Sequence, residues 1–185
     1  MAILDEAVTT ARFTGLSGLT IGTLAERTGL SKSGLYAHFK SKETLQLATM
    51  AHNREQFVSE VMRPALTAAR GEKRLRALIE NWMRWCEHPG VCLFQSAANE
   101  FGDRSGPLHD QMMADEHDLL DSIGQILGTL ISSGDIRPDT DITQISLEVL
   151  GALAGYKWMR RVLHEPTAAQ RTWTAVDRIL DSLRP

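Results

Sequence analysis

The chain has 185 residues, of which 43% are hydrophobic and 23% are charged, a balance typical of folded globular proteins and not of disordered ones. The formal net charge of −3 argues against a protein that coats nucleic acid without selectivity. The chain has no apolar run of about 20 residues, the length of a membrane-spanning helix, and its start, "MAILDEAVTTARF", is unlike a signal peptide. We therefore expect a cytoplasmic protein with no membrane partner.

Helical periodicity runs through nearly the whole chain, and strand-like alternation is scarce. The pattern predicts an all-α fold with about nine helices, divided near residue 45. In chain order, the predicted helices cover about residues 2–13, 20–28, 31–38, 41–64, 72–87, 93–101, 108–132, 142–163 and 167–183.

Boundary signals are clearest in the first fifty residues. Thr20, Ser31 and Ser41 each stand where a helix begins, and a side-chain oxygen at that place can accept a hydrogen bond from a free backbone N–H. Gly15 and Gly29 follow helical runs and are expected to end them. The result is two short helices, 20–28 and 31–38, joined by the turn "GLS".

Two short helices joined by a tight turn that contains glycine are typical of a helix-turn-helix. In that motif the second helix enters the major groove of DNA with its first turn against base edges. Here the first turn reads "SKSG", which is small and polar, and aromatic and basic residues that can contact phosphate follow. The residues expected at DNA on this reasoning are Ser31, Lys32, Ser33, Gly34, Tyr36, His38 and Lys42. Periodicity alone leaves a purely structural helix-turn-helix open.

The segment "LTIGTLAERTGLSKSGLYAHFKSKETL" resembles the DNA-binding signature of the tetracycline-repressor (TetR) family of bacterial transcription regulators. The resemblance covers about residues 3–47, and "LAERTGLSKSGLYAHFKSKE" is its most specific part. In that family the positions matched by Thr20, Lys32, Tyr36, His38 and Lys42 usually contact DNA. The resemblance implies a helix-turn-helix DNA-binding domain in residues 1–45, a helical regulatory and dimerisation domain in residues 46–185, and a double-stranded operator as partner.

Two features depart from the family pattern. Many members have glycine and threonine where this chain has Ser33 and Gly34, so base readout is expected to differ. Members also usually carry a basic arm before the first helix. Here only two residues precede Ile3, which indicates lower affinity or a start downstream of the natural one.

The resemblance further implies a homodimer that releases DNA when a small molecule binds. In "LGALAG", Gly151 and Gly155 lie four residues apart, so that a second helix could approach closely. An intramolecular packing face remains the alternative. The residues expected at the dimer interface are Gly151, Gly155, Trp158, Val176 and Leu180.

Large apolar residues are frequent in the helices between about residues 41 and 132, and methionine and tryptophan suit adaptable apolar sites. We expect an apolar or aromatic effector there, although the same residues could simply form core. The residues expected to bind it are Phe57, Met62, Trp82, Trp85, Phe94, Met113 and His117.

Enzyme and cofactor signatures are missing from the sequence. It contains no GxSxG, HExxH, P-loop or Rossmann glycine pattern. Cys86 and Cys92 are expected to be ordinary thiols, because a disulfide is improbable in a cytosolic protein and no fourth metal ligand is evident. We therefore expect no enzymatic activity, no metal and no cofactor. The leading hypothesis is a repressor, and the alternative is an all-α small-molecule binding or adaptor protein with a structural helix-turn-helix.

Overall fold

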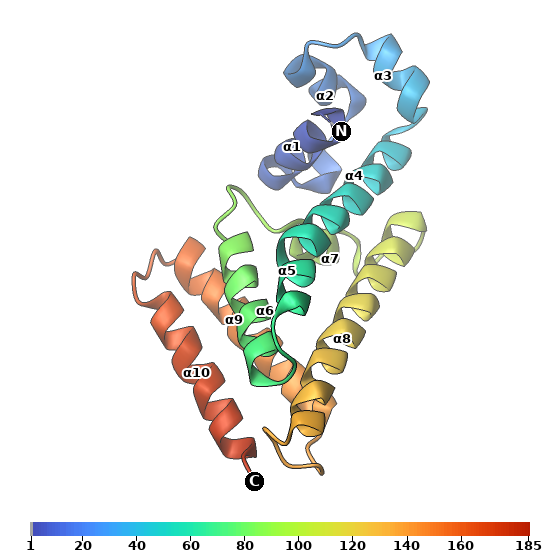
Figure 1. Cartoon of the computed structure of the whole chain (residues 1–185). Helices are drawn as coiled ribbons and strands as arrows, with labels where there is room; N and C mark the ends of the chain where they lie inside the picture. The colour runs from blue at the N-terminus through green and yellow to red at the C-terminus, as the bar shows by residue number, and fades with distance from the viewer. Residues whose placement is uncertain (1) are drawn as a thin grey trace. The chain divides into compact units, whose positions relative to one another are not determined.

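The computed structural model describes residues 2–185, and these residues form helices and connecting loops without a strand (Figure 1). The elements are α1 (Ala2–Gly18), α2 (Ile21–Thr28), α3 (Lys32–Phe39), α4 (Lys42–Phe57), the π-helical turn η1 (Val58–Met62), α5 (Arg63–Thr67), α6 (Glu72–Trp85), α7 (Leu93–Phe101), α8 (Pro107–Ser133), α9 (Ile142–Arg161) and α10 (Ala168–Leu183). Because α4, η1 and α5 follow one another without a break, the described residues make nine continuous helical segments. The all-α prediction is confirmed.

The predicted helix boundaries near the amino terminus are confirmed by their hydrogen bonds. Thr20 accepts from the amide of the residue three positions on at 3.0 Å, Ser31 does the same at 3.1 Å, and Ser41 at 3.0 Å. Gly29 ends α2 with a φ of 69°, a left-handed conformation that glycine adopts at little cost. Each cap supplies a hydrogen-bond partner that the helix itself cannot offer.

The structure divides into two compact units. The first contains the described residues up to Phe57 together with Pro89–His117, and the second contains Val58–His88 and Asp118–Pro185. This division does not follow the boundary expected at residue 45. The physical reason is that α1 packs against both α4 and α7, so residues far apart in the chain share the core of the first unit.

In the first unit, α1 packs against α2, α4 and α7, and α3 packs against α2 and α4. Ala7 and Ala11 are completely buried, and Leu24 of α2 and Leu35 of α3 join the same core. Leu30, in the turn between those helices, is 45% exposed. The helix-turn-helix is therefore attached to the unit through its buried face, and its opposite face remains open.

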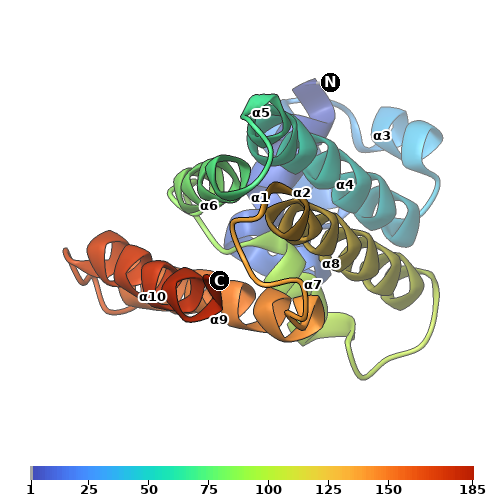
Figure 2. The same cartoon turned by 60° about the horizontal axis from the view of Figure 1, so that its bottom comes forward.

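In the second unit, α9 and α10 form an antiparallel hairpin, and α6 packs against α5, η1 and α9 (Figures 1 and 2). Its core combines residues of α6, α9 and α10. They are Leu75, Leu78, Ile79, Val149, Leu153, Val176 and Leu180, each at most 3% exposed.

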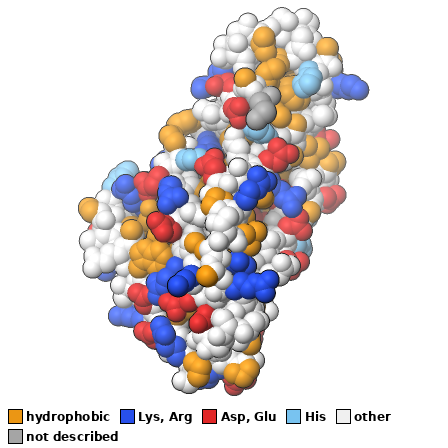
Figure 3. All heavy atoms as spheres, viewed as in Figure 1, with side chains coloured by type: hydrophobic (Ala, Val, Ile, Leu, Met, Phe, Trp, Pro, Cys, Tyr) orange, Lys and Arg blue, Asp and Glu red, His pale blue; other side chains and the backbone are white. Residues whose placement is uncertain are grey.

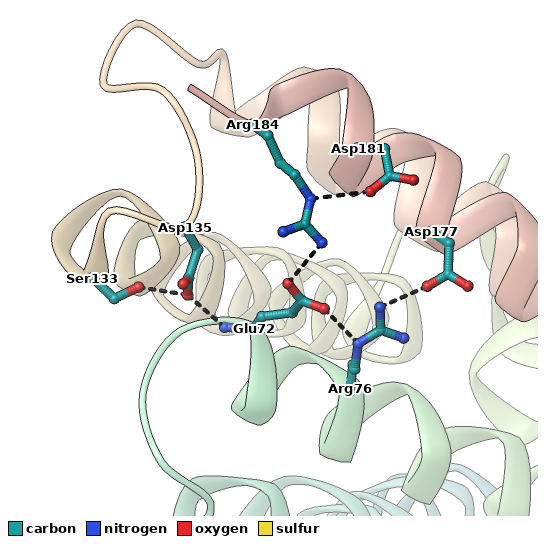
Figure 4. A network of polar contacts seen from close by, with 7 residues as sticks. All are labelled: Glu72, Arg76, Ser133, Asp135, Asp177, Asp181 and Arg184. Carbon is teal, nitrogen blue, oxygen red and sulfur yellow. Dashed lines mark hydrogen bonds and ion pairs between the residues drawn. The ribbon is translucent and has the colours of Figure 1, made fainter.

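A polar network joins the start of α6, the end of α8 and α10 within the second unit (Figure 4). Arg76 donates to Asp177 at 2.6 Å and to Glu72 at 2.7 Å. The backbone N–H of Glu72 donates to Asp135 Oδ2 at 2.9 Å. A hydrogen bond from Ser133 and this backbone N–H lower the pKa of Asp135 below its ordinary value. The network therefore links the start of α6, the end of α8 and α10 by hydrogen bonds, which are directional in a way that apolar packing is not.

Candidate DNA-binding surface and effector crevice

The first turn of α3 is exposed and narrow. Ser31, Lys32, Ser33 and Gly34 all lie at the surface. The hydroxyl of Ser31 is occupied by the Gly34 amide, and a β-carbon added at Gly34 would lie 3.0 Å from that hydroxyl oxygen. Glycine therefore keeps this helix end slim, which lets a flat partner approach the backbone N–H groups.

Along the rest of α3, buried side chains on one face hold the helix on the protein, and exposed side chains on the other face remain open to a partner. Leu35 and Phe39 are 2% and 3% exposed, whereas Tyr36 is 62% exposed. His38 is also exposed, and its ring meets Phe39 edge-on with centroids 4.6 Å apart. In Figure 3 the surface over α2 and α3 is mostly uncharged, with basic and histidine side chains near its edges. Tyr36 and His38 thus present polar groups without a role in the core.

Thr20 and Lys42 have partners inside the protein as well. Thr20 is half-buried and forms a reciprocal capping box with Thr23. Lys42 is exposed, and its ammonium donates to the Ser17 carbonyl oxygen at 2.5 Å. Since an ammonium has three donors, this bond leaves Lys42 able to bind a phosphate.

The last turn of α1, which follows a break in the helix at Gly15, is held by two residues that the sequence did not single out. Gln46, almost completely buried, donates to the Leu16 carbonyl oxygen at 2.5 Å. Glu100 accepts from the backbone N–H groups of Leu16 at 3.0 Å and of Ser17 at 2.6 Å. A glutamine on the buried face of a helix was a signal that could have been used. Nothing in the local sequence of Glu100 indicates a partner more than eighty residues away.

A crevice in the first unit lies among α4, α7 and the first part of α8. Most of its lining is apolar, and three polar side chains share it. The lining residues are Met50, Asn53, Leu93, Phe94, Ala97, Met112, Asp115 and Glu116. We call this feature the effector crevice.

Two carboxyl groups border the effector crevice. Asp115 is buried, lies 3.5 Å from Arg54 and accepts a hydrogen bond from Gln111 at 2.9 Å. Burial, and then the charge of Asp115, raise the pKa of Glu116 above its ordinary value. The site therefore combines an apolar wall with two carboxyl groups, one of which is paired with Arg54.

The residues predicted to bind an effector are distributed over both units. Phe94 lines the effector crevice, and Phe57 is buried with its ring 5.3 Å from that of Phe94. Met113 and His117 are exposed and lie outside its lining. Met62, Trp82 and Trp85 belong to the second unit, where Met62 and Trp85 are buried and Trp82 is half-buried. Met50, Asn53 and Asp115 were not anticipated.

The residues predicted at a dimer interface separate into two groups. Gly151, Gly155 and Trp158 are exposed on α9, with Trp158 60% exposed. Val176 and Leu180 are 0% and 2% exposed within a single chain. A second copy could bury no more of those two side chains, so their assignment to the interface is corrected: they pack inside the second unit.

Within residues 2–185, no helix combines the length and apolarity needed to cross a membrane. Over the same residues, His, Cys, Asp and Glu side chains do not gather in threes at a spacing that could hold a metal ion. Cys86 is buried and Cys92 half-buried, and neither of these two residues is in a disulfide bond.

A helix-turn-helix whose second helix, α3, is capped by Ser31 and exposes its first turn is typical of DNA-binding proteins. Comparison with known protein families agrees with this class. The family model "Bacterial regulatory proteins, tetR family" matches residues 3–49. The model "Tetracyclin repressor-like, C-terminal domain" matches residues 71–176, more than half of the chain. The chain belongs to the TetR family of transcription regulators.

Individual relatives give the same fold. A TetR transcriptional regulator from Chloroflexus aurantiacus J-10-FL superimposes with a TM-score of 0.84 at 23% identity, covering 97% of this chain and 91% of that one. AibR, solved in complex with isovaleryl coenzyme A and operator DNA, gives 0.72 at 22% identity, covering 100% and 97%. The HTH-type transcriptional activator FasR of Mycolicibacterium smegmatis is 38% identical over 65 residues, 35% of this chain and 30% of that protein. The matched segment thus spans less than a third of that curated relative.

Proposed function

We propose that this TetR-family regulator is a homodimeric transcriptional repressor that binds a near-palindromic operator and releases it when an apolar effector occupies the effector crevice. The observation that carries the proposal is the exposed first turn of α3, residues 31–34, held on a buried base by Leu35 and Phe39. In this proposal the regulator acts in the cytoplasm, on chromosomal DNA.

The proposed DNA contacts follow from exposure and chemistry. Lys32 and Ser33 stand on the first turn of α3, where they can reach base edges. Tyr36, His38 and Lys42 are exposed and carry donors suited to phosphate oxygens. Phosphate contacts of this kind position the recognition helix, and base contacts select the sequence.

The proposed dimer interface is the exposed face of α9. Trp158 and Leu147 are 60% and 65% exposed there, and a β-carbon added at Gly151 or Gly155 would meet no atom within 4 Å. Exposed large apolar groups beside small residues form a surface that a second copy can cover. Two copies would carry two recognition helices for half-sites about 34–36 Å apart, as successive major grooves demand.

The effector crevice supports an apolar ligand that is neutral or positively charged. Five of its lining residues are apolar, and Asp115 and Glu116 place carboxyl groups beside them. A ligand rich in phosphate, such as the isovaleryl coenzyme A bound to AibR, would place negative charge beside the carboxyl group of Asp115, which Arg54 already balances. The two regulators are therefore expected to differ in effector class.

The experiment is a selection of genomic fragments by the purified protein, followed by footprinting and a transcription assay on the recovered site. A repressor will protect the site and lower transcription from it. Because FasR carries the name of an activator, a rise in transcription is the outcome that would reverse the proposed direction. Recovery of no protected site at moderate salt would leave a structural helix-turn-helix and overturn the DNA-binding role.

A further inference from the structure

Glu100, on α7, holds the last turn of α1, Leu16 and Ser17, which follows the break at Gly15 and leads into α2. We infer that it is a positioning residue for DNA binding, which sets where the helix-turn-helix sits on α1. The inference rests on the proposed DNA-binding function and concerns only the first unit, in which α7 packs against α1.

The geometry is that of a carboxylate clamp on two consecutive amides. Glu100 Oε1 accepts from the backbone N–H of Leu16 at 3.0 Å, and its Oε2 accepts from that of Ser17 at 2.6 Å. The hydroxyl of Ser96, one turn earlier on α7, donates to Oε1 at 2.5 Å and orients the group. Hydrogen bonds to a charged acceptor are about twice as strong as neutral ones, so this contact outweighs an ordinary loop contact.

Gly15 makes the clamp possible. Its φ of 73° and ψ of 165° turn the chain so that the next two N–H groups point toward Glu100. A β-carbon added at Gly15 would lie 2.8 Å from Glu100 Oε1. A side chain there would therefore be strained by the backbone conformation and would also push the carboxylate away.

The carbonyl side of the same turn is held by α4. Gln46 donates to the Leu16 carbonyl oxygen, and Lys42 donates to that of Ser17, both at 2.5 Å. Leu16 and Ser17 are thus tied to α7 through their N–H groups and to α4 through their C=O groups. Thr20, which caps α2, follows three residues after Ser17. The position of the start of the helix-turn-helix is therefore set by contacts with both α4 and α7.

The charge of Glu100 matches this role. Burial alone would raise the pKa of Glu100, but hydrogen bonds from Ser17, Ser96 and the Leu16 amide outweigh it, so the pKa lies below its ordinary value. Phe94 and Ala97, which line the effector crevice, lie on the same helix. α7 therefore carries both a wall of the crevice and the residue that fixes the last turn of α1.

The test compares Glu100→Gln with Asp103→Asn. Asp103 is an exposed acid two residues beyond the end of α7, so the control removes the same charge nearby without touching the turn. For each protein we would measure hydrogen exchange at the Leu16 and Ser17 amides, and affinity for the selected operator and for a scrambled duplex. The glutamine variant is expected to exchange at least about tenfold faster at those amides, because one carboxylate oxygen is replaced by a donor. Its operator-to-scrambled affinity ratio should fall about tenfold, and the control should match the wild type.

The ratio separates positioning from mere stability, because partial unfolding weakens binding to both duplexes equally. Gly15→Ala, which displaces the same carboxylate, should lower the ratio as well. A glutamine variant that keeps the wild-type ratio while the wild type binds its operator would overturn the inference and leave the proposed function intact. A wild type that selects no operator would overturn the proposed function, and the inference with it.

Discussion

Gly71 lies against the carboxylate of Asp135, so closely that a β-carbon at position 71 would overlap Asp135 Oδ2 and lie 2.6 Å from Ser133 Oγ. Gly71 also has a φ of 83°, and the N–H of the next residue donates to the same Asp135 oxygen. The start of α6 therefore depends on a residue without a side chain.

Gly71→Ala is expected to lower the free energy of unfolding by about 2–4 kcal/mol. The alanine would have to adopt a left-handed backbone conformation, its β-carbon would overlap Asp135 Oδ2, and the hydrogen bond from the Glu72 N–H to that oxygen would break. Urea denaturation measures the decrease. Gly134→Ala is the matched control: its φ is 77°, but an added β-carbon meets nothing within 4 Å, so the decrease should be only about 1 kcal/mol. Equal decreases in the two variants would show that the contact with Asp135 carries no energy.

Tyr156 is expected to make stability depend on alkaline pH. Burial, and then its 2.6 Å hydrogen bond to Glu87, raise the pKa of Tyr156 from 10.0 to about 12. Because the pKa is higher in the folded state than in the unfolded state, the protonated phenol stabilises the folded protein. This contribution to the free energy of unfolding is fully present below pH 10 and is lost as the pH rises toward 12. The free energy of unfolding should therefore fall steeply between those values, and Tyr156→Phe should flatten that slope. In a Tyr36→Phe background Tyr156 is the only tyrosine, and a phenolate titration with its midpoint near 10 would contradict the assignment.

Lys42 and Lys32 are expected to act differently on DNA. Lys42→Ala should reduce the slope of log affinity against log salt by about one unit for each phosphate that the variant no longer binds. Lys32→Ala should instead change which sequences are preferred, because Lys32 lies on the first turn of the reading helix. Binding titrations at several salt concentrations, with Lys73→Ala as an exposed control on α6, separate the two effects. A Lys42 variant with an unchanged salt slope would refute the assignment.

Gly155→Leu is expected to convert the proposed dimer into a folded monomer. Because an added β-carbon at Gly155 meets no atom of its own chain within 4 Å, leucine should be tolerated by the isolated subunit. Sedimentation velocity gives the oligomeric state, and a monomer should bind one half-site weakly. Gly128→Leu on α8 provides the same substitution at another helical glycine with open space around it. If the Gly155 variant sediments as a tight dimer, the interface lies elsewhere.

Sequence reasoning succeeded where the signal was local. Thr20, Ser31 and Ser41 were placed at helix starts because a cap and its partner amide lie within three residues of each other. The end of the helix predicted at Pro64 was wrong, since α5 continues to Thr67. Proline stands near the beginning of α5, directly after the π-helical turn η1, where the hydrogen-bond pattern of the helix changes.

Sequence reasoning failed where the partner is distant. Periodicity shows that Val176 and Leu180 lie on an apolar face, but it cannot tell burial by the same chain from burial by a second copy. The pairing of Glu100 with Leu16 spans 84 residues and has no local signature. The grouping of Pro89–His117 with the amino-terminal helices likewise depends on tertiary packing and not on the pattern of any one helix.

The π-helical turn η1 has a consequence for the spacing of buried residues along one long helix. From α4 through α5 a buried residue recurs at every fourth position: Leu45, Thr49, Asn53, Phe57, Val61 and Ala65. In a regular α-helix of 3.6 residues per turn, each step of four advances by about 40°, so such a stripe winds steadily around the axis. In a π turn the backbone hydrogen bonds join residues five apart, so the turn contains about one more residue than a turn of α-helix. This extra residue reduces the rotation of the buried stripe around the helix axis. Deleting the exposed Ser59 would remove this extra residue and rotate all later positions by about 100°, so a single-residue deletion here would change which side chains the helix buries.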